Sequence, residues 1–400
     1  MSIMQKDFFI SNRAALREKV GDDPIIVSAY TLLQRSGDAA FKFEQEANFW
    51  YLTGIDSADW KLVIEGERSW LIAPDVDEVH QIFDGSIAAD EALQTSGVDM
   101  VLNFSEGEKL MADLASKYQK VFTIGDDPRK GHYDFALNPG PVQLLETLQA
   151  IFATVNDCRS ELAKLRAIKK PEEIEQMKAA IALTVEAFDK VKENMQSYTS
   201  EYEIEADFSY AFRKNGAKGH AYDPIVAMGK NACTLHYVKN EDDLEAGQFV
   251  LLDIGARYNG YAADITRTYA FGKMSDRHVV VHRAVETAHH EIIALLQPGV
   301  NVKEYFHKVD EIMIATLHEL GLLKEKSDYR KYFPHSISHG LGIDVHDSLG
   351  GPEVFQPGMV LTVEPGIYIP EEGIGVRIED DILITEAGNE NLSHKLSTSL

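Results

Sequence analysis

The sequence contains little cysteine, no long apolar run and no cluster of basic residues. Cys158 and Cys233 are its two cysteines, which excludes a disulfide framework and a cysteine-based metal site. The N-terminal segment MSIMQKDFFISNRAALREKV lacks the apolar core of a signal peptide, and no run of about 18 apolar residues follows it. We therefore expect a cytoplasmic protein without a membrane segment.

Acidic residues outnumber basic ones in this chain. Its 400 residues include 64 Asp and Glu against 39 Lys and Arg, which gives a net charge of −25. Nucleic-acid binding requires a basic surface, so this composition argues against a nucleic-acid partner. The hydrophobic share of 44% is that of a globular protein with an ample core. At roughly 150 residues per domain, the length predicts two or three domains.

The expected pattern of helices and strands changes near residue 160. Before this point, short strands and helices mix: Ile25–Tyr30 is a β-branched run, and Lys61–Ile72 predicts a hairpin that turns at Glu65–Glu67. After it, long helices alternate with paired strands. We predict an α/β (α+β) protein with a smaller mixed N-terminal domain over residues 1–158 and a C-terminal domain over residues 159–400.

Helix start and stop signals are clear in the second domain. Pro171, followed by two glutamates, predicts the start of a long helix. Ser200 with Glu203 has the spacing of a capping box. Asn301 opens a further helix, which Gly321 can close. These helices flank two predicted strand pairs.

Histidine is concentrated in the second domain. Twelve of the 14 histidines follow residue 200, and three of them lie within twelve residues: His335, His339 and His346. This segment is not the zinc-binding His-Glu-x-x-His helix, because Ser336 replaces the Glu. Viewed alone, His236 is more typical of a packing residue than of a ligand. The mid-helix pair His289–His290 is expected to be exposed.

The first strand pair carries two acids. Each predicted strand is apolar apart from one of them: Phe249–Gly255 with Asp253, and Tyr261–Tyr269 with Asp264. A turn at Tyr258-Asn259-Gly260 would place the two carboxylates nearly opposite each other, within a residue or two of register. Like charges in such positions destabilise a hairpin unless a positive group lies between them. The simpler alternative is that one acid caps a turn and the other pairs with Arg267.

The second strand pair repeats this pattern: Val360–Ile369 with Glu364, and Gly375–Thr385 with Glu379. Alternation places Arg377 and Glu379 on one face. A single buried Glu is usually a salt-bridged structural residue, but two acid-bearing pairs make that alternative less attractive. Four carboxylates and at least one His suit hard divalent ions such as Mn²⁺, Mg²⁺ or Fe²⁺. They fit best around two ions about 3.5–4 Å apart.

Five segments, in order, resemble the dinuclear pita-bread metallopeptidases, a group that includes methionine aminopeptidase, Xaa-Pro aminopeptidase (aminopeptidase P) and prolidase. They are Leu252-Asp253-Ile-Gly, Tyr261-Ala-Ala-Asp264-Ile-Thr-Arg-Thr, Ser338-His339-Gly-Leu-Gly, Thr362-Val-Glu364-Pro-Gly and Arg377-Ile-Glu379-Asp-Asp. The order Asp, Asp, His, Glu, Glu is that of the family. The resemblance implies a pita-bread fold for the C-terminal domain.

The first domain indicates which members of this group the chain resembles most. Arg35-Ser-Gly-Asp38 and Phe43-Glu-Gln-Glu-Ala-Asn-Phe-Trp50-Tyr-Leu-Thr-Gly resemble the N-terminal domain of aminopeptidase P and, more loosely, that of prolidase. Methionine aminopeptidases lack this domain. Without the resemblance, the aromatic run would be interpreted as a core strand.

The resemblance also implies a role for each site residue. Metal ligands would be Asp253 on one ion, Asp264 and Glu379 bridging both, and His339 and Glu364 on the other. Glu364 would also shuttle the proton, His346 would stabilise the oxyanion and His236 would contact the scissile nitrogen. His236, His335 and His346 would line the substrate site. Arg377 would lie beside substrate and metal and hold Glu379 or Asp264.

The implied activity is that of a metal-dependent aminopeptidase. It would hydrolyse the bond between an N-terminal residue and a penultimate proline, through a hydroxide that bridges two ions. The implied metal is Mn²⁺, with Co²⁺, Fe²⁺ or Zn²⁺ as alternatives. Substrates would be peptides with proline at position two, and the chain would form a homodimer or homotetramer.

Three alternatives remain open at this point. A prolidase would use the same metals on the same bond, but in dipeptides only. A pita-bread fold can also serve as a non-catalytic binding protein, or as a metal-independent hydrolase resembling creatinase. Both of these are less favoured, because all five ligand positions are intact.

Overall fold

The computed structural model describes residues 4–125, 127, 130–132, 135–325 and 328–400. The chain divides into two units, residues 1–165 and 166–400. This division falls within helix α7 (Arg159–Ala167), seven residues after the predicted boundary at residue 158. In the described part of the chain, no helix is both long and apolar enough to cross a membrane.

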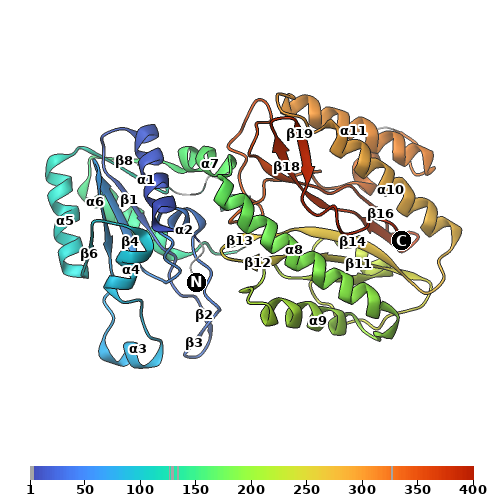
Figure 1. The fold of residues 1–400 in the computed structure, drawn as a ribbon, viewed down its shortest axis with the longest axis horizontal. Helices are drawn as coiled ribbons and strands as arrows, with labels where there is room; N and C mark the ends of the chain where they lie inside the picture. The colour runs from blue at the N-terminus through green and yellow to red at the C-terminus, as the bar shows by residue number, and fades with distance from the viewer. Residues whose placement is uncertain (1–3, 126, 128–129, 133–134, 326–327) are drawn as a thin grey trace. The chain divides into compact units, whose positions relative to one another are not determined.

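A six-stranded mixed sheet forms the centre of the first unit (Figure 1), in the order β6-β5-β4-β1-β7-β8. Strand β4 is antiparallel to β1 and β5, whereas β6, β7 and β8 each run parallel to an inner neighbour. The elements are α1 (Lys6–Val20), β1 (Ile25–Ser28), β2 (Gln34–Ser36), β3 (Ala39–Ala40), α2 (Ala47–Thr53), β4 (Lys61–Glu65), β5 (Arg68–Ile72), α3 (Glu78–Phe83), α4 (Ala89–Ser96), β6 (Met100–Leu102), α5 (Phe104–Lys117), β7 (Lys120–Thr123), η1 (Lys130–His132), α6 (Pro139–Ile151) and β8 (Thr154–Asp157).

The predictions for the first unit are largely confirmed. The β-branched run forms β1, and β4 pairs with β5 as the predicted hairpin, closed by Gly66 and Glu67. The aromatic run that includes Trp50, however, forms helix α2 and not a strand. Its N-cap is Glu46, whose carboxylate accepts from the N–H of Phe49, so a local cap outweighs the strand preference of the aromatic side chains.

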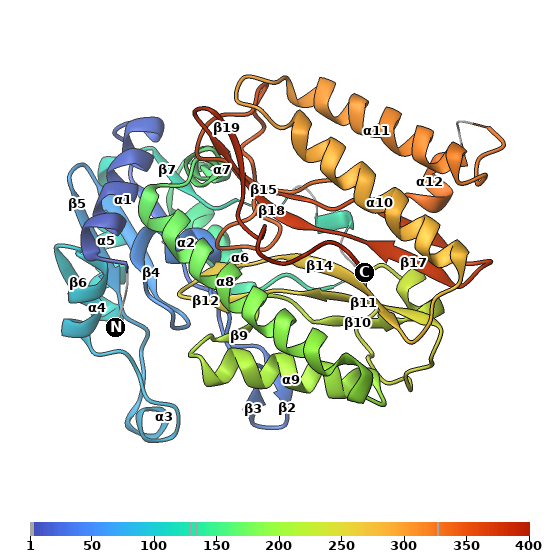
Figure 2. The same ribbon diagram turned by 45° about the vertical axis from the view of Figure 1, so that its right-hand side comes forward.

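The second unit consists of two helix pairs packed on antiparallel strands. Helices α8 and α9 share a core with β10, β11 and β14, whereas α10 and α11 share one with β15 to β18. Figure 2 shows the first pair in green below the strands and the second in orange above them. The elements are α8 (Pro171–Asn194), η2 (Met195–Ser197), α9 (Glu201–Lys214), β9 (Gly219–His220), β10 (Ile225–Met228), η3 (Gly229–Cys233), β11 (Gln248–Ile254), β12 (Ala256–Tyr258), β13 (Tyr261–Ala262), β14 (Ile265–Phe271), α10 (Asp276–Leu295), α11 (Val302–Glu319), α12 (Tyr329–Tyr332), β15 (Val360–Val363), β16 (Gly366–Ile369), β17 (Ile374–Arg377), β18 (Asp380–Thr385) and β19 (Gly388–Asn391).

The first predicted strand pair is confirmed. Strand β11 pairs with β14 and places Asp253 opposite Thr266, so Asp264 lies two residues from the facing position. The turn at Asn259-Gly260, where both residues have positive φ, joins the short strands β12 and β13. Gly255 permits the close approach, because a Cβ there would lie 1.7 Å from the carbonyl oxygen of Ala263.

The second predicted pair is not one continuous hairpin. Strand β15 pairs with β18, and β16 pairs with β17. Each predicted strand is therefore interrupted once, between β15 and β16 and between β17 and β18. Pro365 has no N–H and so interrupts one strand. The breaks leave Glu364 and Glu379 outside the ladders, and Glu379 instead donates its N–H to the carbonyl of Thr266, at 3.0 Å. The two halves of the unit therefore meet at the predicted metal ligands.

Two helix starts differ in their caps. Asn301 caps α11 as predicted, because its side chain accepts from the N–H groups of Lys303 and Glu304. The capping box at Ser200 is wrong: its hydroxyl makes no capping hydrogen bond. Glu203 instead accepts from the N–H and hydroxyl of Thr199. Glu203 therefore binds Thr199, one residue before the Ser200 that the motif predicts.

Candidate metal centre

One cavity of about 380 Å³ in the second unit collects the residues that the sequence singles out. Its lining includes all nine: His236, Asp253, Asp264, His335, His339, His346, Glu364, Arg377 and Glu379. They come from the loop after η3, from β11, from the segment before β14, from the loop before β15, from the end of β17 and from the two breaks in the second strand pair. Tertiary folding thus brings together residues that are more than 140 positions apart.

Asp264, His339 and Glu379 form the tightest group in the cavity. Each offers a ligand atom, and these atoms lie within 4.8 Å of one another. The Nδ1 of His339 lies 3.0 Å from the carbonyl of Gly340, which favours the tautomer that leaves Nε2 free for a ligand. That Nε2 lies 3.4 Å from Asp264 and 3.5 Å from Glu364. Glu364 is therefore adjacent to the group.

The electrostatics of the cavity favour bound cations. Burial and neighbouring carboxylates raise the pKa of Asp264, raise that of Glu364 to about 7, and raise that of Glu379 well above its usual value. Burial lowers the pKa of His339, but Asp264, Glu364 and the carbonyl of Gly340 together outweigh this effect and raise the pKa to about 9. Crowded buried carboxylates need protons or metal ions to neutralise them. This donor set therefore fits divalent ions.

Asp253 is held by two protein groups. Its Oδ1 accepts from the hydroxyl of Tyr222, and its Oδ2 accepts from Arg377. Each carboxylate oxygen has a second lone pair, so neither contact prevents Asp253 from binding a metal. Sequence reasoning missed Tyr222, which lies in an irregular segment before β10 with no pattern to mark it.

Arg377 does not hold its predicted partners directly. The resemblance implied that Arg377 holds Glu379 or Asp264. It donates instead to Asp253, to the hydroxyl of Tyr368 at 2.8 Å and to that of Thr266 at 3.1 Å. Thr266 in turn donates to Glu379 at 2.6 Å. Thr266 was also missed, although the predicted strand Tyr261–Tyr269 contains both it and Asp264, and a spacing of two on a strand places both side chains on one face.

The remaining histidines border the same cavity. His335 lies with Nε2 3.0 Å from the hydroxyl of Tyr368, and burial lowers its pKa to about 4. The ring of His346 lies 4.2 Å from that of His339, and burial, followed by that neighbour, lowers its pKa to about 4. Both rings are therefore neutral near pH 7. His236 lies on an exposed loop after η3.

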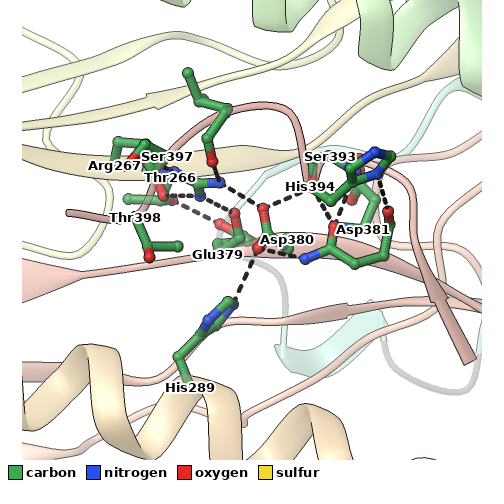
Figure 3. Close-up of polar contacts among 12 residues, drawn as sticks. Thr266, Arg267, His289, Glu379, Asp380, Asp381, Ser393, His394, Ser397 and Thr398 are labelled. Carbon is green, nitrogen blue, oxygen red and sulfur yellow. Dashed lines mark hydrogen bonds and ion pairs between the residues drawn. The ribbon is translucent and has the colours of Figure 1, made fainter.

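A buried network of hydrogen bonds and ion pairs around Arg267 and Asp380 holds the backbone of Glu379 (Figure 3). Arg267 donates to the carbonyl of Glu379 at 2.7 Å and to the carboxylate of Asp380 at 2.6 Å. The alternative in which Arg267 pairs with one of Asp253 and Asp264 is therefore wrong, because its carboxylate partner is Asp380. His289 is also buried, not exposed, because its face of α10 packs toward Asp380, with Nε2 3.4 Å from the carboxylate. His290 is exposed as predicted.

Comparisons with known proteins agree with this geometry. Residues 175–386 match metallopeptidase family M24, and residues 9–122 match the aminopeptidase P N-terminal domain. The Xaa-Pro aminopeptidase of Escherichia coli (strain K12) is 34% identical, over 98% of this chain and 96% of its own. Xaa-Pro aminopeptidase 3 of Homo sapiens is 32% identical, over 96% of this chain and 80% of its own.

Solved structures show the same likeness. Aminopeptidase P from E. coli with the inhibitor Pro-Leu superposes with a TM-score of 0.88 at 32% identity, covering 99% of this chain and 96% of the other. A zinc-substituted form of that enzyme in complex with product gives 0.87. The predicted pita-bread architecture and the predicted resemblance are thereby confirmed. This chain belongs to metallopeptidase family M24 and carries the N-terminal domain of aminopeptidase P.

Proposed function

We propose that this metallopeptidase removes the N-terminal residue from peptides whose second residue is proline, with two Mn²⁺ ions as its working metals. The observation that carries the proposal is the group of Asp264, His339 and Glu379, whose ligand atoms lie within 4.8 Å of one another. Asp253 and Glu364 line the same cavity and complete the proposed ligand set. Co²⁺, Fe²⁺ and Zn²⁺ are the alternatives.

The chemistry divides between ions and side chains. When bound, two divalent ions lower the pKa of a water molecule and polarise the scissile carbonyl. Glu364 takes the proton of the attacking water and passes it toward the leaving nitrogen. Its position beside His339, and a pKa raised to about 7 by burial, suit a group that both gains and loses a proton.

The histidines act on the substrate in this proposal. Neutral His346 donates a hydrogen bond to the oxyanion, and His236 contacts the scissile nitrogen. His335 and the apolar residues Ile225, Leu235 and Val345 border the cavity and would enclose the proline ring. Proline offers no N–H at the scissile bond, so this wall needs no acceptor for one.

A peptide panel tests the proposal. Ala-Pro-Ala should be cleaved with Mn²⁺ and not after metal removal, while Ala-Ala-Ala resists cleavage. The relatives named above are Xaa-Pro aminopeptidases, which favours the tripeptide over the dipeptide Ala-Pro. Efficient cleavage of Ala-Pro alone would replace the proposal with prolidase activity. Cleavage of none of these peptides by protein that retains two ions would support a non-catalytic binding protein.

Substitution of a ligand provides the second test. Glu379→Ala should lower kcat/KM by at least about a hundredfold and reduce the Mn²⁺ retained after dialysis. Glu386→Ala, at an exposed position shortly after β18, is the matched control and should behave as the parent. Undiminished activity in Glu379→Ala would contradict the proposed ligand set and would favour a metal-independent hydrolase.

Location and assembly are part of the same proposal. Both described cysteines are free, as is usual for proteins of a reducing cytoplasm. Cell fractionation tests the cytoplasmic location. Analytical ultracentrifugation tests the homodimer or homotetramer that the resemblance implies.

A further inference from the structure

Glu201, the first residue of α9, is a fully buried acid outside the metal centre. Its carboxylate accepts four hydrogen bonds: from the N–H of Met228 at 2.8 Å, the side-chain amide of Asn231 at 3.1 Å, the hydroxyl of Tyr237 at 2.9 Å and the N–H of Asp242 at 3.0 Å. A carboxylate has two lone pairs on each oxygen. All four acceptor sites of Glu201 are therefore used.

These four donors all belong to one segment, residues 228–242. Beyond η3 this segment has little regular structure, yet it forms one wall of the cavity through Leu235, His236 and Val238. Tyr237 is the direct neighbour of His236. An irregular loop has few backbone hydrogen bonds of its own to hold its shape, so its conformation depends on the groups it contacts.

The start of α9 is also joined to the end of this loop through the backbone. The N–H of Glu201 donates to the carbonyl of Asp242 at 3.0 Å, and the N–H of Leu244 donates to the carbonyl of Thr199 at 2.8 Å. The carboxylate and the backbone therefore fix the same two chain segments to each other.

One turn further along α9, a second contact reaches the loop. Asn240 is buried and has a positive φ of 49°. Its amide donates to Glu205 at 2.8 Å, and its oxygen accepts from the N–H of Val226 at 2.9 Å. Residues four apart share one face of a helix, so Glu201 and Glu205 hold the loop on both sides of Tyr237.

We propose that Glu201 is a positioning residue that holds the loop of residues 229–242, and with it His236, against the substrate cavity. The inference rests on the proposed function, because it assigns the effect of Glu201 to peptide turnover. Glu201 touches neither the cavity nor the predicted metal ligands, so it acts through the loop. Metal binding should be independent of it.

Glu201→Gln is the sharpest substitution. Glutamine keeps the shape but offers one acceptor oxygen and one NH₂ donor, so a buried N–H, of either Met228 or Asp242, loses its acceptor. Tyr237→Phe removes a single hydrogen-bond donor and leaves the carboxylate of Glu201 with its three other donors. Glu203→Gln is the matched control, since Glu203 lies half-buried on the same turn of α9 and its carboxylate accepts from Thr199, before the helix and not from the loop.

Kinetics on Ala-Pro-Ala with Mn²⁺ provide the first readout. We expect kcat/KM to fall about 10–100-fold in Glu201→Gln and a few-fold in Tyr237→Phe, because misplacement of a positioning loop by about 1 Å carries losses of this size. Glu203→Gln should match the parent. Mn²⁺ affinity from calorimetry should be equal in all four proteins. Equal losses in the Glu201 and Glu203 variants, or unchanged turnover in Glu201→Gln, would overturn the inference.

Hydrogen exchange provides a readout that needs no activity. Amides of residues 229–242 should exchange faster in Glu201→Gln than in the parent, and those of β14 should not. If the parent cleaves no Xaa-Pro peptide, the proposed function fails, while this comparison still tests the anchor. If Glu201→Gln does not fold, parent-like exchange and turnover in Tyr237→Phe would refute the inference.

Discussion

At the scale of single residues, Thr266 connects groups that would otherwise be independent. Its hydroxyl donates to Glu379 and accepts from Arg377, and its carbonyl accepts from the N–H of Glu379. Groups behind a metal ligand set the direction of its lone pairs. Thr266 is therefore a component of the proposed metal centre without being a ligand.

Thr266→Val is expected to weaken Mn²⁺ binding about 10–100-fold, the usual cost of losing such a supporting group. Valine keeps the volume and the strand preference of threonine, so the change removes only the hydroxyl. Titration calorimetry measures the affinity. Thr316→Val on α11 removes a hydroxyl that donates to the carbonyl of Ile312 in its own helix and is the control. Parent-like affinity in Thr266→Val would show that Glu379 does not need this support.

His282 predicts a loss of stability in acid. Burial lowers its pKa from 6.5 to about 4, so the unfolded chain takes up the proton first as pH falls. The folded state is thus unaffected above pH 6.5 and loses stability between pH 6.5 and 4. At pH 5 this amounts to about 2 kcal/mol, at 1.36 kcal/mol per pKa unit.

His282→Leu should remove this contribution. Urea denaturation of metal-free protein gives the free energy of unfolding at pH 7.5 and at pH 5. The decrease in this free energy from pH 7.5 to pH 5 should be about 2 kcal/mol smaller in the variant than in the parent. At pH 7.5 both proteins have a neutral group at this position, so that comparison measures packing alone. The same pH dependence in parent and variant would contradict the assignment.

At the scale of elements, the loop of residues 339–347 carries two of the site histidines, and buried charges hold it. Asp347 contacts Arg166 at 2.9 Å and Lys169 at 3.3 Å, and its N–H donates to the carbonyl of Gly340 at 2.8 Å. Asp347 is therefore the point at which α7 and the segment before α8 fix this loop.

Two aspartates of this loop make a matched pair. Asp347 and Asp344 both contact Arg166, but their side chains are 3% and 51% exposed. Asp347→Asn removes the buried carboxylate that Arg166 and Lys169 share and should cost about 3–5 kcal/mol of unfolding free energy. Asp344→Asn should cost less than about 1 kcal/mol, as for an exposed pair. Equal costs in urea denaturation would show that burial does not set the strength of these contacts.

At the scale of the whole molecule, each unit has a hydrophobic core of its own. All proposed ligands belong to residues 166–400. A ligand stabilises the folded state that binds it, by about 2.7 kcal/mol at a concentration a hundred times its Kd. Mn²⁺ should therefore slow hydrogen exchange in β11 and β14 and leave the β4–β5 hairpin unchanged. Equal protection of that hairpin would show that the two units unfold together.

Much of the local structure follows from the sequence. Pro171 with its two glutamates starts α8 as predicted, and the turn at Asn259-Gly260 lies where its residue types require it. The capping box at Ser200 fails because its hydroxyl makes no cap while Thr199 occupies the carboxylate of Glu203. His289 is buried for a reason remote from its own helix, since Asp380 lies about ninety positions away.

The sequence by itself determined the family, the first strand pair and the acids and histidines that line the cavity, because these depend on residue type, spacing and order. The tertiary structure alone decided which groups support those residues. Arg377 contacts Asp253, Thr266 supports Glu379 and Glu201 holds the loop of His236. Hydrogen bonds between distant segments depend on how β11, β14, β17 and α9 pack in three dimensions, and no local pattern records that packing.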